Sequence, residues 1–332
     1  MNERTTFDLI LPFLRPIEHL ILDDNISEIM VNAGSQVFIE RNGALEAVPD
    51  IALSETALNA AVRNIARRLG DDVSETKPIL DSRLPDGSRV AAVIRPSSID
   101  GITLTIRKFN TRNFTMDDLI RIGTLSQPVA DLLKSRVERH DNILISGGTG
   151  TGKTTLLNIL TGFIPDEDRI ILIEDTAEIN IKKPNLVRFE ARKEQNGIPP
   201  ITIRDLLRAT LRHRPDRIIV GEIRGGEAFD LLQALNTGHS GTLSTIHANS
   251  AAQALQRFTS CVLQSGVDLP YRAIKSHIAD SIQLLVHIER QHGKRLVSQI
   301  LEIQAYSGDS DKYQLKTLFE TGDQYGIHTT TS

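Results

Sequence analysis

The stretch NILISGGTGTGKTT, residues 142–155, decides the fold of the larger part of this 332-residue chain. It begins with an apolar run predicted to be a strand, continues through a glycine-rich turn and leads into a predicted helix at residues 153–163. The pattern GxxxxGK(S/T) between a strand and a helix is the phosphate-binding P-loop. Glycines let backbone N–H groups turn toward phosphates, and the helix N-terminus favours a polyanion. The sequence therefore predicts binding and hydrolysis of a nucleoside triphosphate, with ATP as the ligand.

Each residue of the motif has an expected role. Lys153 is expected to contact the β- and γ-phosphates, and the hydroxyl of Thr154 to ligate Mg²⁺. A glycine-rich turn without a ligand is the alternative, and the strand and helix on either side argue against it. The predicted nucleotide-binding residues of the loop are Gly147, Gly148, Thr149, Gly150, Thr151, Gly152, Lys153, Thr154 and Thr155.

From residue 142 onward, short apolar strands alternate with helices, which is typical of a parallel sheet with crossover helices. Strands are predicted at residues 142–146, 170–174, 217–221 and 242–247. Helices are predicted at residues 153–163, 203–212, 227–236, 251–264 and 271–281. A C-terminal antiparallel extension is predicted from strands at residues 283–289, 295–306 and 313–320.

The residues before the P-loop indicate a second, smaller unit. A first helix is expected within residues 1–22 and another at 54–69, and the β-favouring runs lie at 27–32, 36–41, 79–84, 88–94 and 102–109. We therefore predict an α/β fold in which a RecA-like P-loop NTPase C-terminal domain follows a smaller α+β N-terminal domain. The expected domains are residues 1–122 and 137–332, with a linker region at 123–136.

Two acidic segments follow predicted buried strands, where open parallel sheets place their ligands. The first ends at Glu178, the candidate for orienting or deprotonating the attacking water. In the second, an apolar strand leads to Glu222 in the form of a Walker B motif, but Gly221 replaces the usual Asp. Two alternatives for Mg²⁺ therefore stay open. Either Glu222 holds it through water together with Thr154, or the acidic pair at residues 174–175 helps.

His247 ends another predicted strand on the phosphate side, so we expect it to sense the γ-phosphate. A metal site around it is not expected, because no acidic or Cys partner lies at ligand spacing. Cys261 is the only cysteine, which excludes an intramolecular disulfide and favours a reducing compartment.

Composition narrows the class of partners. The net charge of −4, the aromatic content of 4% and the absence of Trp argue against direct readout of nucleic acid. No apolar run approaches the ~20 residues of a membrane-spanning helix. We expect a cytoplasmic protein that associates peripherally with a membrane.

Four segments in this order resemble the Walker A, Asp box, Walker B and His box of the secretion-superfamily traffic ATPases. They are residues 147–154, IEDTAE at 173–178, RPDRIIVGEIR at 214–224 and TGHSGT at 237–242. The most similar branch is the hexameric ATPase of conjugation and type IV secretion systems. The resemblance covers nearly the whole chain, because the predicted strands of the N-terminal unit also fit that family.

The resemblance implies specific roles. It places the catalytic carboxylates on Glu178 and Glu222, with Thr154 and Glu222 on the metal side, and a phosphate-side arginine on Arg214. N-terminal-domain arginines that reach the nucleotide would be Arg89 and Arg107, with Arg83, Arg95 and Lys108 as rivals. The predicted catalytic set is Lys153, Glu178, Glu222, His247 and Arg214.

The resemblance also implies a homo-hexameric ring with ATP held between the two domains, which powers substrate translocation or pilus assembly. Its partners would be inner-membrane components of the machine and other secretion ATPases. A nucleic-acid translocase, a non-catalytic assembly platform and a small-molecule kinase are the alternatives. They would need, respectively, a basic or aromatic pore, loss of the catalytic residues, and an acceptor pocket with a lid.

Overall fold

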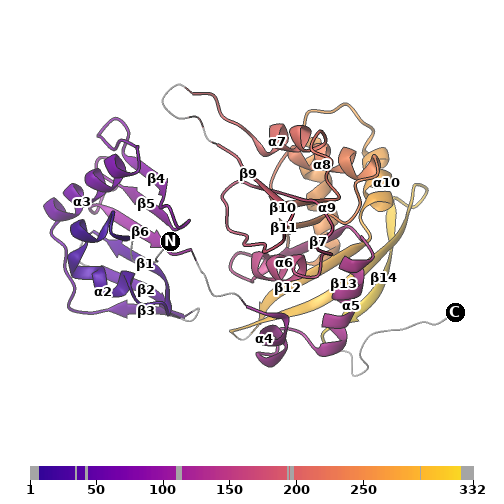
Figure 1. Ribbon diagram of the computed structural model, residues 1–332, viewed down its shortest axis with the longest axis horizontal. Helices are drawn as coiled ribbons and strands as arrows, with labels where there is room; N and C mark the ends of the chain where they lie inside the picture. The colour runs from indigo at the N-terminus through magenta and orange to yellow at the C-terminus, as the bar shows by residue number, and fades with distance from the viewer. Residues whose placement is uncertain are drawn as a thin grey trace. The chain divides into compact units, whose positions relative to one another are not determined.

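The computed structural model describes residues 7–33, 36–41, 44–109, 114–192, 194, 198–291 and 293–322. The chain divides into two compact units, and the second begins at Phe114 (Figure 1). This corrects the predicted linker at residues 123–136. Helix α5 (Gln127–Glu138) fills most of that range and buries Val129 and Leu133 in the core of the second unit. An amphipathic helix packed in this way belongs to a domain rather than to a connection.

The first unit is a six-stranded antiparallel sheet with strand order β3-β2-β1-β6-β5-β4. Its strands are β1 (Ile26–Asn32), β2 (Gln36–Arg41), β3 (Ala44–Val48), β4 (Ile79–Arg83), β5 (Arg89–Val93) and β6 (Thr103–Arg107). Helix α3 (Glu55–Arg68) starts at Ser54, whose side chain accepts a hydrogen bond from the N–H of Ala57. It packs Leu58 and Ile65 into the core, as the sequence pattern predicts.

The start of the first unit differs from the single helix expected there. Among the described residues it forms the short turns η1 (Leu11–Phe13) and η2 (Arg15–Ile17) and the single-turn helix α2 (Glu18–Ile21). Pro12 and Pro16 each stand inside a 3₁₀ turn. Because proline lacks the N–H that continues a helix, each one starts a new turn instead of extending the last.

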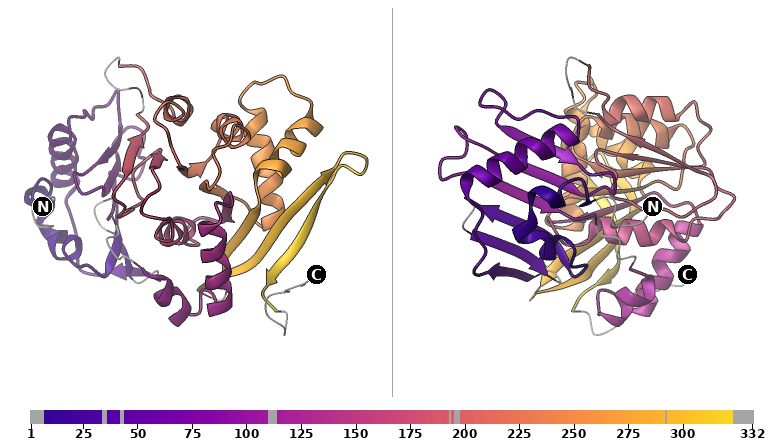
Figure 2. Two further views of the ribbon diagram at one scale, coloured as in Figure 1. Left: turned by 45° about the vertical axis from the view of Figure 1, so that its right-hand side comes forward. Right: turned by 60° about the vertical axis from the view of Figure 1, so that its left-hand side comes forward.

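The second unit is an eight-stranded sheet with strand order β14-β13-β12-β7-β11-β10-β8-β9. Its strands are β7 (Ile143–Gly147), β8 (Ile170–Glu174), β9 (Leu186–Glu190), β10 (Arg217–Ile223), β11 (Leu243–His247), β12 (Leu284–Gln291), β13 (Lys294–Ser307) and β14 (Lys312–Glu320). Strands β7 to β12 run parallel, and β13 and β14 add an antiparallel hairpin. Figure 2 shows this hairpin in yellow. The predicted α/β fold class is confirmed.

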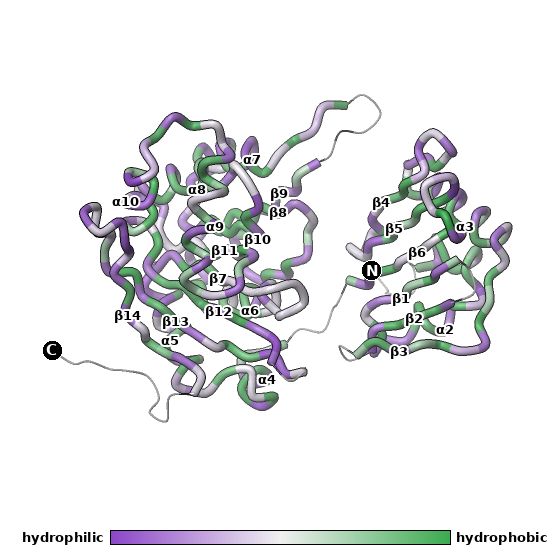
Figure 3. The backbone as a smooth tube through the Cα atoms, turned by 180° about the vertical axis from the view of Figure 1, so that it is seen from behind, coloured by the Kyte–Doolittle hydropathy of each residue, from purple (hydrophilic) through white to green (hydrophobic). Residues whose placement is uncertain are grey.

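Helices cover both faces of this sheet, so its central strands are buried on both sides. One core includes residues of α4 (Met116–Arg121), α5 and α6 (Lys153–Thr161). The other includes residues of α7 (Ile203–Thr210), α8 (Glu227–Asn236), α9 (Ala251–Leu263) and α10 (Tyr271–Ser281). Figure 3 shows hydrophobic colouring on these central strands. No helix among the described residues is long and apolar enough to cross a membrane.

Parallel strands bring their carboxyl ends to one edge of the sheet. Gly147 at the end of β7 is paired with His247 at the end of β11, and β10 lies on the far side of β11. The ends of β7, β8, β10 and β11 therefore meet at this edge, and the predicted site residues of the second unit, except Arg214, lie on these strand ends or in the segments that follow them.

Candidate nucleotide site

The phosphate loop, residues 147–154, requires glycine at defined points. A Cβ on Gly147 would lie 2.2 Å from the carbonyl oxygen of Ile288, which no other residue could tolerate. Gly152 starts α6 with a φ of 100°, a left-handed conformation that favours glycine. Thr151 closes the loop by donating its hydroxyl to the carbonyl of Gly148 at 3.0 Å. The loop thus leads directly into the N-terminus of α6, where an anion is stabilised.

Lys153 is a buried cation, and no carboxylate of the described residues forms a hydrogen bond with it. Its Nζ donates to the carbonyls of Gly147 and Gly148 at 3.0 and 2.8 Å, and lies 3.4 Å from Nδ1 of His247. Burial lowers the pKa of the Lys153 ammonium, and the nearby Glu222 carboxylate opposes this effect. A triphosphate beside Nζ would supply the missing negative charge and stabilise the ammonium form.

Glu222 and His247 meet at the end of the strands. Oε1 of Glu222 lies 2.7 Å from Nε2 of His247, and this buried oxygen accepts no hydrogen bond. Burial, together with the Lys153 charge, lowers the pKa of His247, while Glu222 raises it. The imidazole is therefore neutral at pH 7 and lies within contact of both phosphate-side groups.

Arg224 completes this cluster, although the sequence analysis gave it no role. Its Nε and Nη2 donate to Oε2 of Glu222 at 2.9 and 2.6 Å, and its Nη1 donates to Oδ2 of Asp175 at 3.1 Å. The available signal was its spacing two residues after Glu222, which places both side chains on the same face of an extended segment. Arg224 thus connects the end of β10 with the end of β8.

Glu174 lies beside Gly221, the position of the missing Walker B aspartate. A Cβ on Gly221 would lie 3.2 Å from Cγ of Glu174, so the stem of Glu174 occupies the space that an aspartate side chain needs. Its Oε1 accepts from the backbone N–H groups of Glu178 and Ile179 at 2.7 and 2.8 Å. Burial raises the pKa of Glu174, and these two hydrogen bonds oppose the shift. Glu174 therefore shapes the turn that presents Glu178.

Glu178 itself is exposed, and its carboxylate makes no hydrogen bond with the described residues. It is free to contact a water molecule, as the predicted role requires. Thr154 and Thr155 lie in the first turn of α6, half-buried.

The donors at this edge fit Mg²⁺. They are the hydroxyl of Thr154 and the orphaned Oε1 of Glu222, both oxygen atoms, which this ion prefers. No group of three or more acidic, His or Cys side chains gathers as a metal site in the part of the chain that the structure describes. An ion here would therefore complete its shell with phosphate oxygens and water, as Mg²⁺ usually does.

A pocket of about 340 Å³ opens next to the phosphate loop. It is lined by Gly148, by His247 and the two residues after it, and by the exposed side of α9 from Gln253 to Ser260. The lining is mixed and includes Arg257 and Ala248. The pocket lies beside His247, on the side of the phosphate loop where β11 lies.

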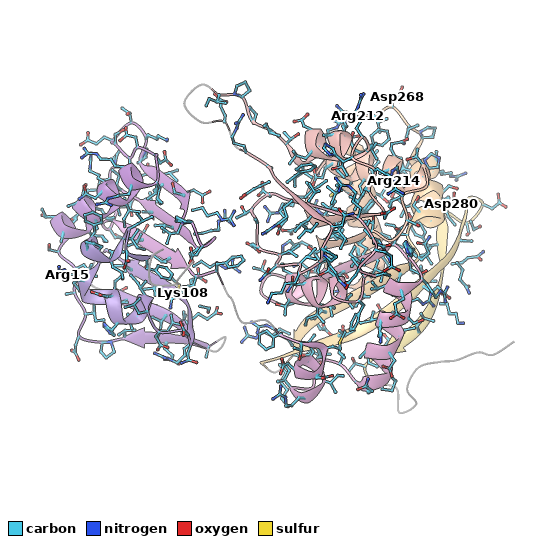
Figure 4. All side chains as sticks on the ribbon, viewed as in Figure 1. Arg15, Lys108, Arg212, Arg214, Asp268 and Asp280 are labelled. Atoms are coloured by element: carbon cyan, nitrogen blue, oxygen red, sulfur yellow. The ribbon has the colours of Figure 1, made fainter. Side chains whose placement is uncertain are left out.

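Arg214 does not belong to this constellation. It precedes β10, so it lies at the amino edge of the parallel strands, opposite the phosphate loop. Its side chain is 86% exposed, and its nearest carboxylate is Asp216 at 3.8 Å. Figure 4 labels it with Arg212 on the same connection. The expectation from the family resemblance that Arg214 lies on the phosphate side is corrected, because a residue that precedes a parallel strand lies at the opposite edge of the sheet from the phosphate loop.

Arg89 and Arg107 form part of a row in the first unit. Arg83 on β4 pairs with Arg89 on β5, which pairs with Arg107 on β6. Arg89 also lies 3.5 Å from Asp81, and Arg83 donates to the carbonyl of Gly87. Like charges directly opposite one another in a sheet are destabilising. Carboxylates offset this repulsion, because Glu28 on β1 faces Arg107 and Asp81 lies beside Arg89.

Comparison with known proteins gives the family. Residues 13–314 match the model of the type II/IV secretion system protein family. The chain is 35% identical over 290 residues to the conjugal transfer protein TrbB of Rhizobium radiobacter, covering 86% of each protein. It is 32% identical over 331 residues to the type IV secretion system protein VirB11 of Bartonella henselae, covering 89% of this chain and 93% of that protein.

Among solved structures, the ATPase DotB of Legionella pneumophila shares the fold, with a TM-score of 0.57 and 22% identity over 97% of this chain and 84% of that one. The family match extends over both units, and the phosphate loop with its facing carboxylates lies inside it. The chain therefore belongs to the type II/IV secretion system protein family, as one of its secretion ATPases.

Proposed function

We propose that this protein is a Mg²⁺-dependent ATPase that assembles into a ring of six copies and powers type IV secretion or conjugative transfer. The observation that carries the proposal is the convergence of Lys153, Glu222 and His247 on the phosphate loop. The Nζ of Lys153 lies 3.4 Å from Nδ1 of His247, and Nε2 of His247 lies 2.7 Å from the buried Oε1 of Glu222.

Binding of ATP follows from these groups. The N–H groups of the phosphate loop and the Nζ of Lys153 receive the β- and γ-phosphates. The hydroxyl of Thr154 would bind Mg²⁺ directly, and Glu222 would hold it through a water molecule. When bound, the ion neutralises charge on the β- and γ-phosphate oxygens. His247 is placed to detect whether the γ-phosphate is present, because it contacts both Lys153 and Glu222.

Hydrolysis requires a positioned water. Glu178 orients it and accepts its proton as the water oxygen attacks the γ-phosphorus and the bond to the β,γ-bridging oxygen breaks, releasing ADP and phosphate. Arg89 and Arg107 are proposed to stabilise the charge on the γ-phosphate, as arginine fingers do. Arg89 and Arg107 face each other on β5 and β6, so both can approach one anion, which supports this assignment.

The names of the relatives support the biological role. The TrbB protein is a conjugal transfer protein, and VirB11 is a type IV secretion system protein. We propose that this chain works beside other secretion ATPases at the cytoplasmic side of the inner membrane. There it would bind the inner-membrane components of the secretion machine. ATP binding and release of phosphate would then drive rigid-body motion in the ring.

Phosphate release from ATP by the purified protein, in Mg²⁺ and in excess chelator, tests the proposed function. We expect steady turnover only with Mg²⁺. Light scattering with a non-hydrolysable ATP analogue is expected to give the mass of six copies. Absence of turnover with Mg²⁺, in a protein that binds ATP, would instead indicate an assembly platform.

A further inference from the structure

The β12–β13 hairpin forms a second wall of the phosphate loop. Strand β12 is the parallel neighbour of β7, with His287 paired to Ser146, so the residues after His287 continue alongside the loop. Strand β13 returns antiparallel to β12 and pairs Arg295 with Arg290. The order β12-β7-β11 places this hairpin on the side of the loop away from His247. None of the roles predicted from the sequence involves it.

Arg295 makes the contact between the hairpin and the loop. Its Nε donates to the carbonyl oxygen of Gly150 at 2.9 Å. Its stem also lies over the start of α6, because a Cβ on Gly152 would be 3.5 Å from Cδ of Arg295. The side chain is exposed, and among the described residues Gly150 is its one hydrogen-bond partner. The contact joins segments that are 145 residues apart in sequence.

This hydrogen bond fixes a peptide plane of the loop. Gly150 has a φ of 70°, a conformation that glycine leaves readily. In a trans peptide, the carbonyl of one residue and the N–H of the next point in opposite directions. With the Gly150 carbonyl held by the hairpin, the N–H of Thr151 points away from it. Such N–H groups form the concave anion-binding side of a phosphate loop.

We propose that Arg295 is a positioning residue for the nucleotide. By holding the Gly150 carbonyl, it keeps the 150–151 peptide in the orientation that binds phosphate before ATP arrives. It thereby makes nucleotide affinity depend on the β12–β13 hairpin. This inference rests on the proposed function, because it takes the phosphate loop as the ATP site.

The test compares Arg295→Ala and Arg295→Lys with Lys294→Ala as the matched control. Lys294 is exposed on the same hairpin, and its side chain has no hydrogen bond to the described residues. The Kd of a fluorescent, non-hydrolysable ATP analogue is measured for each variant, together with kcat and KM for ATP. Thermal unfolding of each variant shows that the fold is intact.

We expect Arg295→Ala to raise Kd and KM about fivefold, the effect of one solvent-accessible hydrogen bond, and to leave kcat within about twofold. Arg295→Lys keeps a donor for the same carbonyl and restores most of the affinity, whereas Lys294→Ala matches the wild type. Wild-type affinity in Arg295→Ala would overturn the inference. Equal losses in Arg295→Ala and Lys294→Ala would also overturn it, because charge alone would then explain them.

Lys153→Ala in the same binding assay separates the two proposals. Loss of binding in Lys153→Ala with normal binding in Arg295→Ala removes only the positioning role. Normal binding in Lys153→Ala would show that ATP does not bind at the phosphate loop, which would contradict the proposed function as well.

Discussion

Arg224 holds Glu222 by one carboxylate oxygen only: its Nε and Nη2 both donate to Oε2, at 2.9 and 2.6 Å. The other oxygen, Oε1, is left buried beside His247 without a hydrogen bond. The hydrogen bonds to Oε2 fix the direction of the Glu222 carboxylate, and Oε1 stays available to accept a hydrogen bond. The oxygen that remains is the one a water molecule on Mg²⁺ would need.

Arg224→Ala is therefore expected to impair turnover more than binding. Without its two hydrogen bonds, Glu222 can rotate away, so we expect kcat to fall about tenfold or more, as for other supporting residues of metal sites. The Kd for ATP should change less, because Lys153 and the loop remain. Steady-state kinetics and nucleotide binding measure the two effects. Arg212→Ala, an exposed arginine before β10, serves as the control. A tenfold rise in Kd with unchanged kcat would contradict this role.

Gly221→Asp, which restores the usual Walker B pair, is expected to destabilise the protein. Its Cβ would lie 3.2 Å from Cγ of Glu174, and a second carboxylate would approach a buried one. Overpacking of this kind costs about 1–3 kcal/mol. Urea unfolding measures the loss. Gly308→Asp is the control, because that glycine faces open space and has an ordinary φ. Equal stability of Gly221→Asp and the wild type would show that Glu174 does not occupy the site.

His247 predicts a dependence of stability on pH. Its pKa is lowered by burial and by Lys153, with Arg224 and Arg257 adding to the shift and Glu222 opposing it. The unfolded chain therefore binds more protons than the folded one below the ordinary His pKa of about 6.5, so folding is weakened as pH falls through that range. Urea unfolding at pH 7 and pH 5.5 is expected to show a smaller loss for His247→Gln than for the wild type. Identical losses would contradict a lowered pKa.

The arginine row predicts a loss of activity without a matching loss of stability. Arg89→Ala and Arg107→Ala each remove one like-charge contact but also a charge beside a carboxylate, Asp81 or Glu28, so the stability of the nucleotide-free protein should change little. Phosphate release should fall at least about tenfold, because arginine fingers contribute more than this. Arg15→Ala in the same unit, labelled in Figure 4, is the control. Wild-type turnover in both variants would remove the row from the mechanism.

The sequence predicts the phosphate loop and its facing strands because apolar strands, glycine turns and acidic strand ends are local patterns. Strands β3 and β9 were not predicted from the sequence. Each lies at an edge of its sheet, where exposed residues dilute the alternation of apolar and polar side chains. The predicted first helix was divided by prolines, whose effect outweighs the apolar spacing.

In the site too, some contacts follow from local sequence patterns and others do not. Lys153, Glu222 and His247 come together because parallel strands share an edge, which follows from the strand pattern. The contact of Arg295 with Gly150 and the conflict between Gly221 and Glu174 join separate segments. They depend on strand order and side-chain volume, which one sequence does not reveal.

The most direct test of ATP hydrolysis at the phosphate loop is phosphate release by Lys153→Ala, with Lys312→Ala as an exposed lysine control. Lys153 is the buried cation that the γ-phosphate would neutralise. We therefore predict that its removal lowers turnover at saturating ATP and Mg²⁺ by about 100-fold or more, as for other groups that stabilise transition-state charge. The control should match the wild type. Turnover of Lys153→Ala within about threefold of the wild type would contradict hydrolysis at this loop, since losing such a group costs far more.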